Sequence, residues 1–504
     1  MPNQNPRAPG VSKASLSACI AALLSCGAPA LTHASEVMHS PLLTLLTAKP
    51  KSRSIAAPAS ATPSVIAGDT IAVTSCDDDG GFDTLRHAVL IANPGDTIDL
   101  RGLACSTLTL QAGAIAIGLN DLTILGPGAG KLTIDGNQAG RVFNHSNDGS
   151  LTLSNLTIAH GKVEADKAYG GCIFSQGDVT LDHSVVTSCS AIGQSVSAGG
   201  GIVTYGILSV QSSVISANAA STLVGGTDKP SAVGGGAIAQ EGVVVIESIV
   251  SGNVAQAPTG KVYGGGFLTS TLVLKYSTIS NNQATSAGTI PDYGSGGGFV
   301  TLSDTTIFAS TIDHNLADAA GGVSIRGSGE TQATIALTTI SSNVGTLGIG
   351  ALDTMADLTL RGSTIAFNTS GPTVPAGVTL SGSTTDLQST IIADNAPMDL
   401  AGGGAIFGNN SLVKIAAPGT LVPVGTLTLD PKLGPLAFNG GPTRTHALGA
   451  GSPALEAGSN SLGYAFDQRG PTYLRDIGNA PDIGAYESDN DHIFGDAIDH
   501  PYAL

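Results

Sequence analysis

The stretch Leu272–Asn282, LVLKYSTISNN, together with the glycine run Gly264–Gly266 before it, contains the pattern that decides the fold. The same order of features recurs along the chain: a glycine run, a short alternating segment, a second short segment and an Ile-x-x-Asn sequence. Seven asparagines close the copies at spacings of 25 to 35 residues: Asn218, Asn253, Asn282, Asn315, Asn343, Asn368 and Asn395. A period of this length predicts a solenoid.

Fixed residue types surround each asparagine. An aliphatic residue lies three positions before it, as Ile279 lies before Asn282, and a hydroxyl residue lies five positions before it, as Ser277 does. Copies of this length are too long for a hexapeptide helix and fit a wide parallel β-helix with several strands per turn. We expect the asparagines to stack as a hydrogen-bonded ladder and to adopt the left-handed backbone of a tight corner. Alternation predicts these inward side chains: Leu151, Leu153, Leu208, Val210, Leu272 and Leu274.

Glycine runs precede most copies, and the segment between each asparagine and the next glycine run varies in length. The runs are Gly170–Gly171, Gly199–Gly201, Gly234–Gly236, Gly264–Gly266, Gly296–Gly298 and Gly321–Gly322. Such runs supply positive φ angles or close backbone packing. Variable insertions at one edge of a solenoid form a row of loops, which is often the binding face.

The first 34 residues have the features of a signal peptide. Arg7 and Lys13 precede an apolar run over 16–31, and Thr32-His33-Ala34 provides small residues at the cleavage spacing. The run is too short for a good membrane span, so we expect none after signal removal. A lipid on Cys26 is the alternative interpretation. The expected location is outside the cell: secreted, or on the surface or outer membrane of a bacterium.

Four cysteines remain after residue 34, and an even number in an exported chain predicts disulfides. Four cysteines allow three pairings. We expect Cys76–Cys105 and Cys172–Cys189, because each pair is close in sequence. A metal site is the weaker alternative, because the cysteines form no CxxC motif. The acidic sequence after Cys76 (Asp-Asp-Asp-Gly-Gly) could bind Ca²⁺, but a solvated turn is the preferred interpretation and no cofactor is expected.

Composition limits the possible partners. Only 12% of residues are charged, the net charge is −17, and the chain has 68 glycines and no tryptophan. Phosphate binding requires clustered Lys and Arg, so we expect neither nucleic acid nor an anionic membrane as a partner. An extracellular glycan or protein surface remains, and we expect a monomer.

The repeats are flanked by other segments. Within the entry segment, Leu85–Ala92 has helical apolar spacing with Asp83 placed as its cap, and this helix could cover the open end of the solenoid. Near the C-terminus, Arg469, Arg475, Asp482 and Glu487 are candidate internal ion pairs. The expected divisions are 1–34 signal peptide, 35–68 disordered linker, 69–145 N-terminal cap and first rungs, 146–400 β-helix repeats, 401–487 C-terminal rungs and cap, and 488–504 polar tail.

Several pieces resemble known families. Gly235-Gly236-Ala237-Ile238 and the Ile-x-x-Asn sequences resemble the GGA(I/L/V) and FxxN repeats of polymorphic outer-membrane-protein adhesins, with Ile in place of Phe. Residues 84–100 resemble a CSLREA-type entry module. Residues 430–458, DQRGP (467–471) and PDIGAYE (481–487) are similar to a choice-of-anchor Q domain. These resemblances imply an exported, all-β protein: a right-handed, single-stranded parallel β-helix, a pectate-lyase-like solenoid with a short N-terminal capping helix.

Candidate ligand-binding residues lie before the glycine runs. Tyr169, Tyr263 and Tyr293 each precede a glycine, and stacked copies would bring the rings near one another. With Asp228 and Asp292 nearby, they would suit sugar or protein recognition. The alternative is that each ring packs over bare glycine backbone.

Parallel β-helices also host polysaccharide lyases and hydrolases. Asp182-His183 and Asp313-His314 superficially resemble a catalytic pair, but both occupy a repeating position, which favours a structural role. Other carboxylates about one rung apart are Glu330, Asp353, Asp357 and Asp386. Spacing alone assigns a catalytic role to none of them. No catalytic residue is therefore assigned. We expect an adhesin-like interaction protein that binds through its row of loops, with a polysaccharide lyase or glycoside hydrolase, or a structural cell-envelope spacer, as alternatives.

Overall fold

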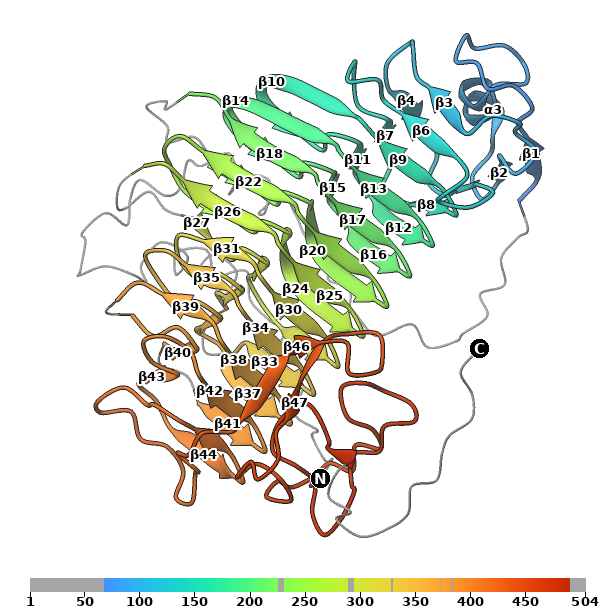
Figure 1. Ribbon diagram of the computed structural model, residues 1–504. Coiled ribbons are helices and arrows are strands. Elements are labelled where there is room, and N and C mark those ends of the chain that lie inside the picture. The colour runs from blue at the N-terminus through green and yellow to red at the C-terminus, as the bar shows by residue number, and fades with distance from the viewer. Residues whose placement is uncertain are drawn as a thin grey trace, which may run out of the picture.

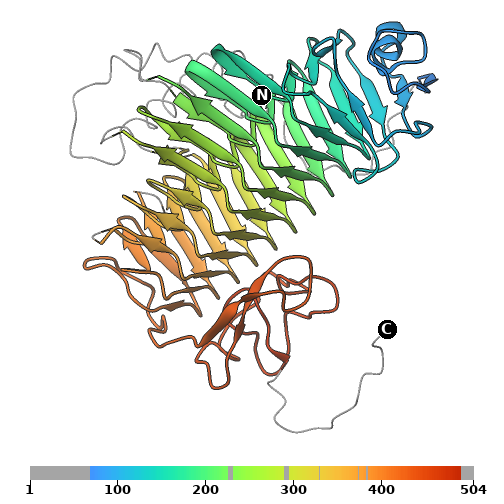
Figure 2. The same ribbon diagram turned by 45° about the horizontal axis from the view of Figure 1, so that its top comes forward.

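The chain winds into an elongated parallel β-helix, as Figures 1 and 2 show. This computed structural model describes residues 68–224, 231–288, 294–327, 330–372, 374–381 and 384–489. Each turn passes through three sheets, here named A, B and C, and each strand pairs in parallel with the equivalent strand of the next turn. The fold class predicted from the repeats, an all-β parallel solenoid with one short helix, is confirmed.

Sheet A receives two strands per turn in most turns, and twenty-two strands of the described residues belong to it. They are β1 (Thr70–Ala72), β2 (Thr97–Asp99), β4 (Ile115–Ile117), β5 (Leu122–Leu125), β7 (Phe143–His145), β8 (Ser150–Ser154), β11 (Ile173–Ser175), β12 (Asp178–Asp182), β15 (Ile202–Thr204), β16 (Ile207–Gln211), β20 (Ala237–Ile246), β24 (Phe267–Lys275), β28 (Phe299–Thr301), β29 (Thr305–Phe308), β32 (Val323–Ile325), β33 (Gln332–Ala336), β36 (Leu352–Thr354), β37 (Asp357–Arg361), β40 (Val378–Leu380), β41 (Thr385–Gln388), β43 (Leu400–Gly402) and β44 (Ile406–Asn409).

Sheet B follows sheet A in each turn and has twelve short strands in the part of the chain that the structure describes. They are β3 (Thr107–Thr109), β6 (Thr133–Asp135), β9 (Thr157–Ala159), β13 (Val185–Thr187), β17 (Val214–Ser216), β21 (Ile249–Ser251), β25 (Thr278–Ser280), β30 (Thr311–Asp313), β34 (Thr339–Ser341), β38 (Thr364–Ala366), β42 (Ile391–Ala393) and β45 (Leu412–Val413).

Sheet C follows sheet B and, outside the undescribed segments, contains eleven strands. They are β10 (Lys162–Tyr169), β14 (Ser190–Ala198), β18 (Ala219–Thr222), β19 (Ser231–Val233), β22 (Val254–Ala257), β23 (Val262–Tyr263), β26 (Gln283–Ser286), β27 (Gly294–Ser295), β31 (Leu316–Ala317), β35 (Val344–Gly345) and β39 (Thr369–Ser370).

The core consists of inward side chains stacked in columns. The predicted inward residues, Leu151 to Leu274 in sheet A, are all at most 1% exposed and belong to one continuous apolar cluster. Strand alternation produces this arrangement, because every second side chain of a strand faces the same side. The middle residue of each sheet B strand faces the same core, as Ile279 does between Val250 and Ile312.

The asparagine ladder forms as predicted at the corner between sheets B and C. The Asn282 amide group donates to Asn315 Oδ1 at 3.0 Å and to the Val250 carbonyl at 2.9 Å, and Asn282 Oδ1 accepts from Asn253. The same bonds link all seven asparagines, from Asn218 to Asn395. The expected left-handed backbone falls instead on the residue before each asparagine, such as Asn281 with φ 56°. The asparagine itself points inward and hydrogen-bonds along the axis.

The hydroxyl five positions before each asparagine forms a second ladder between sheets A and B. Ser277 N donates to Ser310 Oγ at 3.2 Å, and Ser248 N donates to Ser277 Oγ at 3.0 Å. Here too a residue with positive φ precedes the hydroxyl, as Tyr276 precedes Ser277. Each ladder satisfies backbone groups that the corner would otherwise leave buried without a partner.

Sheet C is built from stacked arches. In each arch an outgoing arm (the first part of β14, then β18, β22 and β26) leaves the corner, and a return arm (the last part of β14, then β19, β23 and β27) comes back beside it. Small residues of the two arms pack on each other in a cluster of Ala232, Ala255, Ala257, Val262, Ala284 and Ala317. The outer side of the return arm packs on sheet A, where Val233 and Tyr263 meet Ile238 and Leu268.

This layering explains the glycine runs. A Cβ atom at Gly265 would lie 2.3 Å from the Gly297 carbonyl oxygen and 2.5 Å from Gln283 N, where the outgoing arm of the next arch begins. A Cβ atom at Gly236 would lie 3.0 Å from Asn253 Cγ. The glycines therefore let the return arm pass close to the ladder, which is why glycine runs and asparagines recur together.

The N-terminal end is covered as predicted by a helix, α3 (Leu85–Ile91), whose buried residues Leu85, Ala88 and Val89 join the main core (Figure 1). The cap differs from the expectation. Thr84, not Asp83, accepts from His87 N, because Thr84 is the residue with extended backbone directly before the helix. Within the described residues, no helix is long and apolar enough to cross a membrane.

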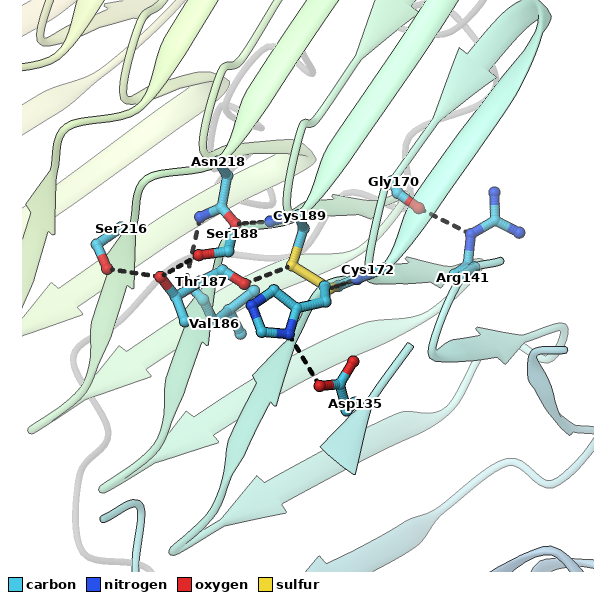
Figure 3. Close-up of a disulfide and its surroundings, with 12 residues drawn as sticks. Asp135, Arg141, Gly170, Cys172, Val186, Thr187, Ser188, Cys189, Ser216 and Asn218 are labelled. Carbon is cyan, nitrogen blue, oxygen red and sulfur yellow. Dashed lines mark hydrogen bonds and ion pairs between the residues drawn. A yellow bond between two sulfur atoms is a disulfide. The ribbon is translucent and has the colours of Figure 1, made fainter. Parts of the chain in front are cut away.

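Both expected disulfides are present, Cys76–Cys105 and Cys172–Cys189. Cys189 takes the place of the first ladder asparagine, and its N–H donates to Asn218 Oδ1 at 3.1 Å (Figure 3). At the other end, Asn395 donates to Asp399 Oδ1 at 2.8 Å. Burial raises the pKa of the Asp399 carboxyl. The ladder is thus closed by a disulfide at one end and a carboxyl at the other.

The segment after the last rung folds back along the solenoid. Residues 433–488, here named the C-terminal module, include an antiparallel pair, β46 (Leu433–Ala437) and β47 (Thr445–Leu448), and lie beside the later strands of sheet B (Figures 1 and 2). Gln468 hydrogen-bonds the hydroxyls of Thr311 and Thr339, and Ala485 N donates to Thr364 Oγ1. The module therefore covers the side of the solenoid, whereas we expected a cap on its end.

Inside the module, the expected ion-pair residues form two groups. Arg475 pairs with Glu487 at 3.3 Å and donates to the Asp482 backbone carbonyl. Arg469 pairs with Asp467 and lies 4.0 Å from the ring centroids of both Tyr473 and Tyr486. Burial raises the pKa of Glu487 to about 8.

Candidate ligand-binding site

The variable loops stand on the tips of the arches. They connect β18 to β19, β22 to β23 and β26 to β27, so all three leave sheet C at the same level of successive turns. Residues 225–230 and 289–293 of these loops lie outside the described part of the chain. Figure 1 shows β18, β22 and β26, from which the three connections start, side by side on successive turns of the solenoid. The repeats therefore arrange the insertions as a row along the axis.

A groove of about 370 Å³, here named the arch-tip groove, opens between these tips. Its lining consists of Thr222, Gln256, Ala257, Pro258, Thr285, Ser286 and Ala287. Parallel pairing fixes the positions, because Gln256 lies opposite Ser221 in one neighbour and Thr285 in the other. The groove therefore runs across successive turns.

The groove presents neutral polar groups beside small apolar ones. Gln256 Nε2 donates to Ser221 Oγ at 3.2 Å, and Thr285 Oγ1 accepts from Gln283 at 2.9 Å. The Thr222 hydroxyl is buried without a hydrogen-bond partner. Amide and hydroxyl groups both donate and accept, so this lining can bind the hydroxyls of a sugar or the backbone of a peptide.

A buried carboxylate supports the rim of the groove. Asp318 Oδ2 accepts from Ser286 N at 2.8 Å and from Gly294 N at 2.6 Å, which joins the outgoing arm to the return arm. The sequence reasoning named the loops but missed Gln256, Thr285 and Ser286. They lie at the ends of unremarkable strands, and only the register of neighbouring turns brings them together.

The candidate tyrosines do not gather at this groove. Tyr169 and Tyr263 share a column in which Ala198 and Val233 lie between them, so about 14 Å separates their positions. Tyr263 is 6% exposed in the apolar cluster between the return arms and sheet A. Tyr169 packs against the same apolar cluster, together with Phe174 and Tyr205, and burial raises the pKa of Tyr169. These contacts favour packing for both rings. Tyr293, Asp228 and Asp292 lie outside the described residues.

The two Asp-His pairs occupy corner positions. His183 and His314 have φ angles of 47° and 55°, and each Nδ1 lies within hydrogen-bond distance of the aspartate before it. Asp313 is fully buried and also pairs with Arg444 of the C-terminal module. Burial raises the Asp313 pKa, while His314 and Arg444 oppose that shift. This pair therefore fastens the module to the solenoid.

Other carboxylates considered for catalysis or metal binding have separate partners. Asp353 pairs with Arg326 at 3.1 Å, and Asp386 pairs with Arg361 at 2.5 Å. Asp357 accepts from Thr384, and Glu330 is exposed. Of the three aspartates after Cys76, Asp78 makes a bidentate pair with Arg86 and accepts from two backbone N–H groups. Among the described residues, no group of three or more His, Cys, Asp or Glu side chains could hold a metal ion.

Comparison with known proteins gives a distant structural likeness. No protein-family model matches the chain, and no curated protein matches it. A crystal structure of pectate lyase Pel9A resembles it with a TM-score of 0.37 and 13% sequence identity, over 84% of this chain and 97% of that chain. The parallel winding of the chain through three sheets places it in the class of parallel β-helix proteins.

Proposed function

We propose that this protein is an exported, adhesin-like interaction protein that binds an extracellular glycan or protein surface along the tips of its arches. The observation that supports this proposal is the arch-tip groove, which successive turns line with Thr222, Gln256, Thr285 and Ser286. Its groups are neutral and able to donate and accept, and Ala257 and Pro258 add apolar surface. Such a mixture suits binding better than proton transfer, which needs a titratable group.

Export is supported by the cysteines and the N-terminal sequence. Disulfides persist in oxidising compartments, and the two present join four cysteines that follow a signal-like segment. The likeness of the repeats to polymorphic outer-membrane-protein adhesins and of residues 430–487 to a choice-of-anchor Q domain supports a protein held at a bacterial surface. Fractionation of the native host should recover the chain at the surface or in the medium, and a cytoplasmic pool would contradict export.

The binding proposal is tested on a glycan array and on immobilised extracellular-matrix proteins. The test variants are Gln256→Ala, which removes an exposed amide, and Ala287→Arg, which fills the groove from an exposed position. Gln211→Ala is the matched control, because Gln211 is an exposed glutamine at the end of a sheet A strand. We expect retention of the native chain on at least one surface, a loss of at least tenfold for Ala287→Arg and a smaller loss for Gln256→Ala.

Two results would overturn the proposal. One is no retention of the native chain on any surface, which would favour a structural spacer. The other is equal retention of the Ala287→Arg variant and the Gln211→Ala control. Incubation with acidic polysaccharides and Ca²⁺ belongs to the same experiment, because turnover would replace the binding proposal with the lyase or hydrolase alternative.

A further inference from the structure

The outer face of the capping helix α3 is apolar and exposed. Leu90 is 79% exposed, Ile91 is 53% exposed, and Phe82, just before the helix, is 91% exposed. His87 joins them, because it lies three and four positions before Leu90 and Ile91 on the same helix face, and its ring contacts the Phe82 ring at 4.9 Å. These four residues are here named the cap face. Single exposed apolar side chains are common on protein surfaces, but a cluster on one helix face indicates a contact surface.

Exposed carboxylates border the cap face. Asp77 and Asp79 lie in the turn after Cys76, and Asp83 directly follows Phe82 in the sequence; all three aspartates are exposed. The backbone N–H of Ser75 donates to the Asp83 carbonyl at 3.0 Å, so this turn is held against the residues that precede α3. The three aspartates are here named the acidic border. A segment that covers the cap face should therefore be apolar and should carry positive charge beside its apolar part.

The segment that precedes β1 in the sequence has this composition. The sequence predicts a linker over residues 35–68, but one part of it, LLTLL (42–46), contains four leucines within five residues. Shortly after it, KPKSR (49–53) carries the three basic residues of the linker. Both stretches lie outside the described part of the chain. An apolar stretch followed by a basic one matches the cap face and its acidic border.

The chain enters the solenoid close to α3. The Asp96 carboxylate accepts from Asp69 N and from Asn93 N, both at 2.8 Å, so the start of the described chain lies beside the loop that follows the helix. The helix has seven residues and is about 10 Å long, whereas the 14 residues 54–67 span at most about 50 Å when extended. Residues 42–53 can therefore reach the cap face of their own chain. Tethering also gives them a high effective concentration there, which favours them over a separate partner.

We propose that residues 42–46 dock on the cap face and that the basic residues of 49–53 lie against the acidic border. The leucines cover Phe82, Leu90 and Ile91, which removes apolar surface from water, and the opposite charges fix the direction of the segment. The N-terminal end of the solenoid is then closed in two layers, with α3 on the core and the tethered segment on α3. This docking does not depend on the arch-tip groove, which lies on sheet C.

Limited digestion of the full exported chain with trypsin tests the docking, with cleavage after Lys51 and Arg53 followed by mass spectrometry. Leu90→Asp places a charge on the cap face, and Leu45→Asp places one on the docking segment. Leu421→Asp is the matched control, because Leu421 is 82% exposed and follows β45, at the other end of the solenoid. We expect cleavage at these two sites to be at least tenfold faster in Leu90→Asp and in Leu45→Asp than in the native chain, and unchanged in Leu421→Asp.

Two further variants test the charges and the pairing. Asp77→Asn/Asp79→Asn should speed cleavage several-fold, less than Leu90→Asp does, because the apolar contact remains. Combining Leu90→Asp with Leu45→Asp should add little to either change, because both break the same contact.

Equal cleavage rates in the native chain and in Leu90→Asp would overturn the inference. So would a native dimer in sedimentation velocity that Leu90→Asp dissociates and Leu45→Asp does not, because a second copy would then occupy the cap face. If Leu90→Asp fails to fold, Leu45→Asp decides the question, since that residue precedes the solenoid, and an unchanged cleavage rate in it would overturn the docking.

Discussion

At the scale of single residues, the ladder asparagines make a set of hydrogen bonds that no other side chain in the turn could make. Asn282 is fully buried, donates to two oxygens and accepts from both the backbone and the side chain of Asn253. The carboxamide supplies two donors and an acceptor in one plane, which matches the parallel stacking of turns. A hydroxyl or an aliphatic side chain would satisfy only part of this set.

The first prediction concerns Asn282→Ala. The Asn253 N–H and side-chain amide lose this acceptor inside a dry core, so the free energy of unfolding should fall by about 2–4 kcal/mol. Thermal unfolding followed by calorimetry measures the loss. Lys275→Ala, on the outer side of sheet A, is the control and should shift the midpoint very little. A smaller shift for Asn282→Ala than for Lys275→Ala would contradict a structural role.

The same residues show what the sequence could and could not predict. Hydrogen bonding between equivalent asparagines follows from their repetition, because parallel stacking places identical positions side by side. The conformation did not follow: the left-handed residue is the variable one before each asparagine, such as His314 or Phe367, and no residue type marks it. The placement of Tyr263 was hidden for a related reason, since it lies on the return arm and packs against sheet A, and the repeat pattern does not reveal that arm.

At the scale of elements, the first arch depends on a covalent bond where later arches depend on the ladder. Among the described strands, β10 pairs only with β14, and Gly161 and Cys189 replace asparagine at the two corners beside it. The Cys172–Cys189 bond joins the residue directly after the glycine run Gly170–Gly171 to the start of β14 (Figure 3). Charged side chains on β10, including Glu164 and Lys167, protect its open edge from pairing with other strands.

The second prediction concerns the double variant Cys172→Ala/Cys189→Ala. A disulfide closing a loop of this size contributes about 3 kcal/mol, so the first arch should open more readily. Hydrogen exchange should accelerate at the amides of β10 and the first part of β14, while amides of β25 and β30 keep their protection. The variant Cys76→Ala/Cys105→Ala is the control, because it removes a disulfide at the N-terminal cap instead. Faster exchange throughout the solenoid would show that the bond stabilises the whole fold.

Elements also explain why the glycine runs were only partly understood from the sequence. Their number and period predicted close packing, which is correct. The segment that the glycines pack against could not be predicted. The two arms of an arch are contiguous in sequence, and no turn motif of constant length separates them. Ala255 and Val262 reveal the arch only once their contact is seen.

At the scale of the whole molecule, the solenoid is a support with two sides in use. The arch tips face one way, and the C-terminal module occupies the other side, on the hydroxyl-rich outer face of sheet B. Repetition could not predict this placement, since the module is not a repeat and its contacts join residues more than 100 positions apart, such as His446 and Ser341.

The docked module should also respond to acid through His446. His446 Nδ1 lies 2.8 Å from the Gly434 carbonyl and Nε2 lies 2.9 Å from Ser341 Oγ, so the neutral ring fits between the module and sheet B. Burial lowers the His446 pKa, although the Gly434 carbonyl and Asp394 oppose the shift. The undocked ring, with an ordinary pKa of 6.5, therefore binds more protons than the docked ring below that pH. Stability from this group is complete above pH 6.5 and is lost as pH falls below it.

The third prediction follows from this loss of stability as the pH falls. Between pH 7.5 and 5.5, the protection factors of the β46 and β47 amides, which correct for the slower intrinsic exchange in acid, should fall in the native chain, with a slope below pH 6.5 of at most about 1.4 kcal/mol per pH unit. His446→Gln keeps a donor and an acceptor without a titrating proton, so its protection factors should change less over the same range. The buried carboxyls Asp313 and Glu487 have raised pKa values, which act in the opposite direction, and they are common to both chains. His183→Gln, at an exposed corner away from the module, is the control. If native and His446→Gln chains show the same pH dependence, His446 does not couple docking to protons.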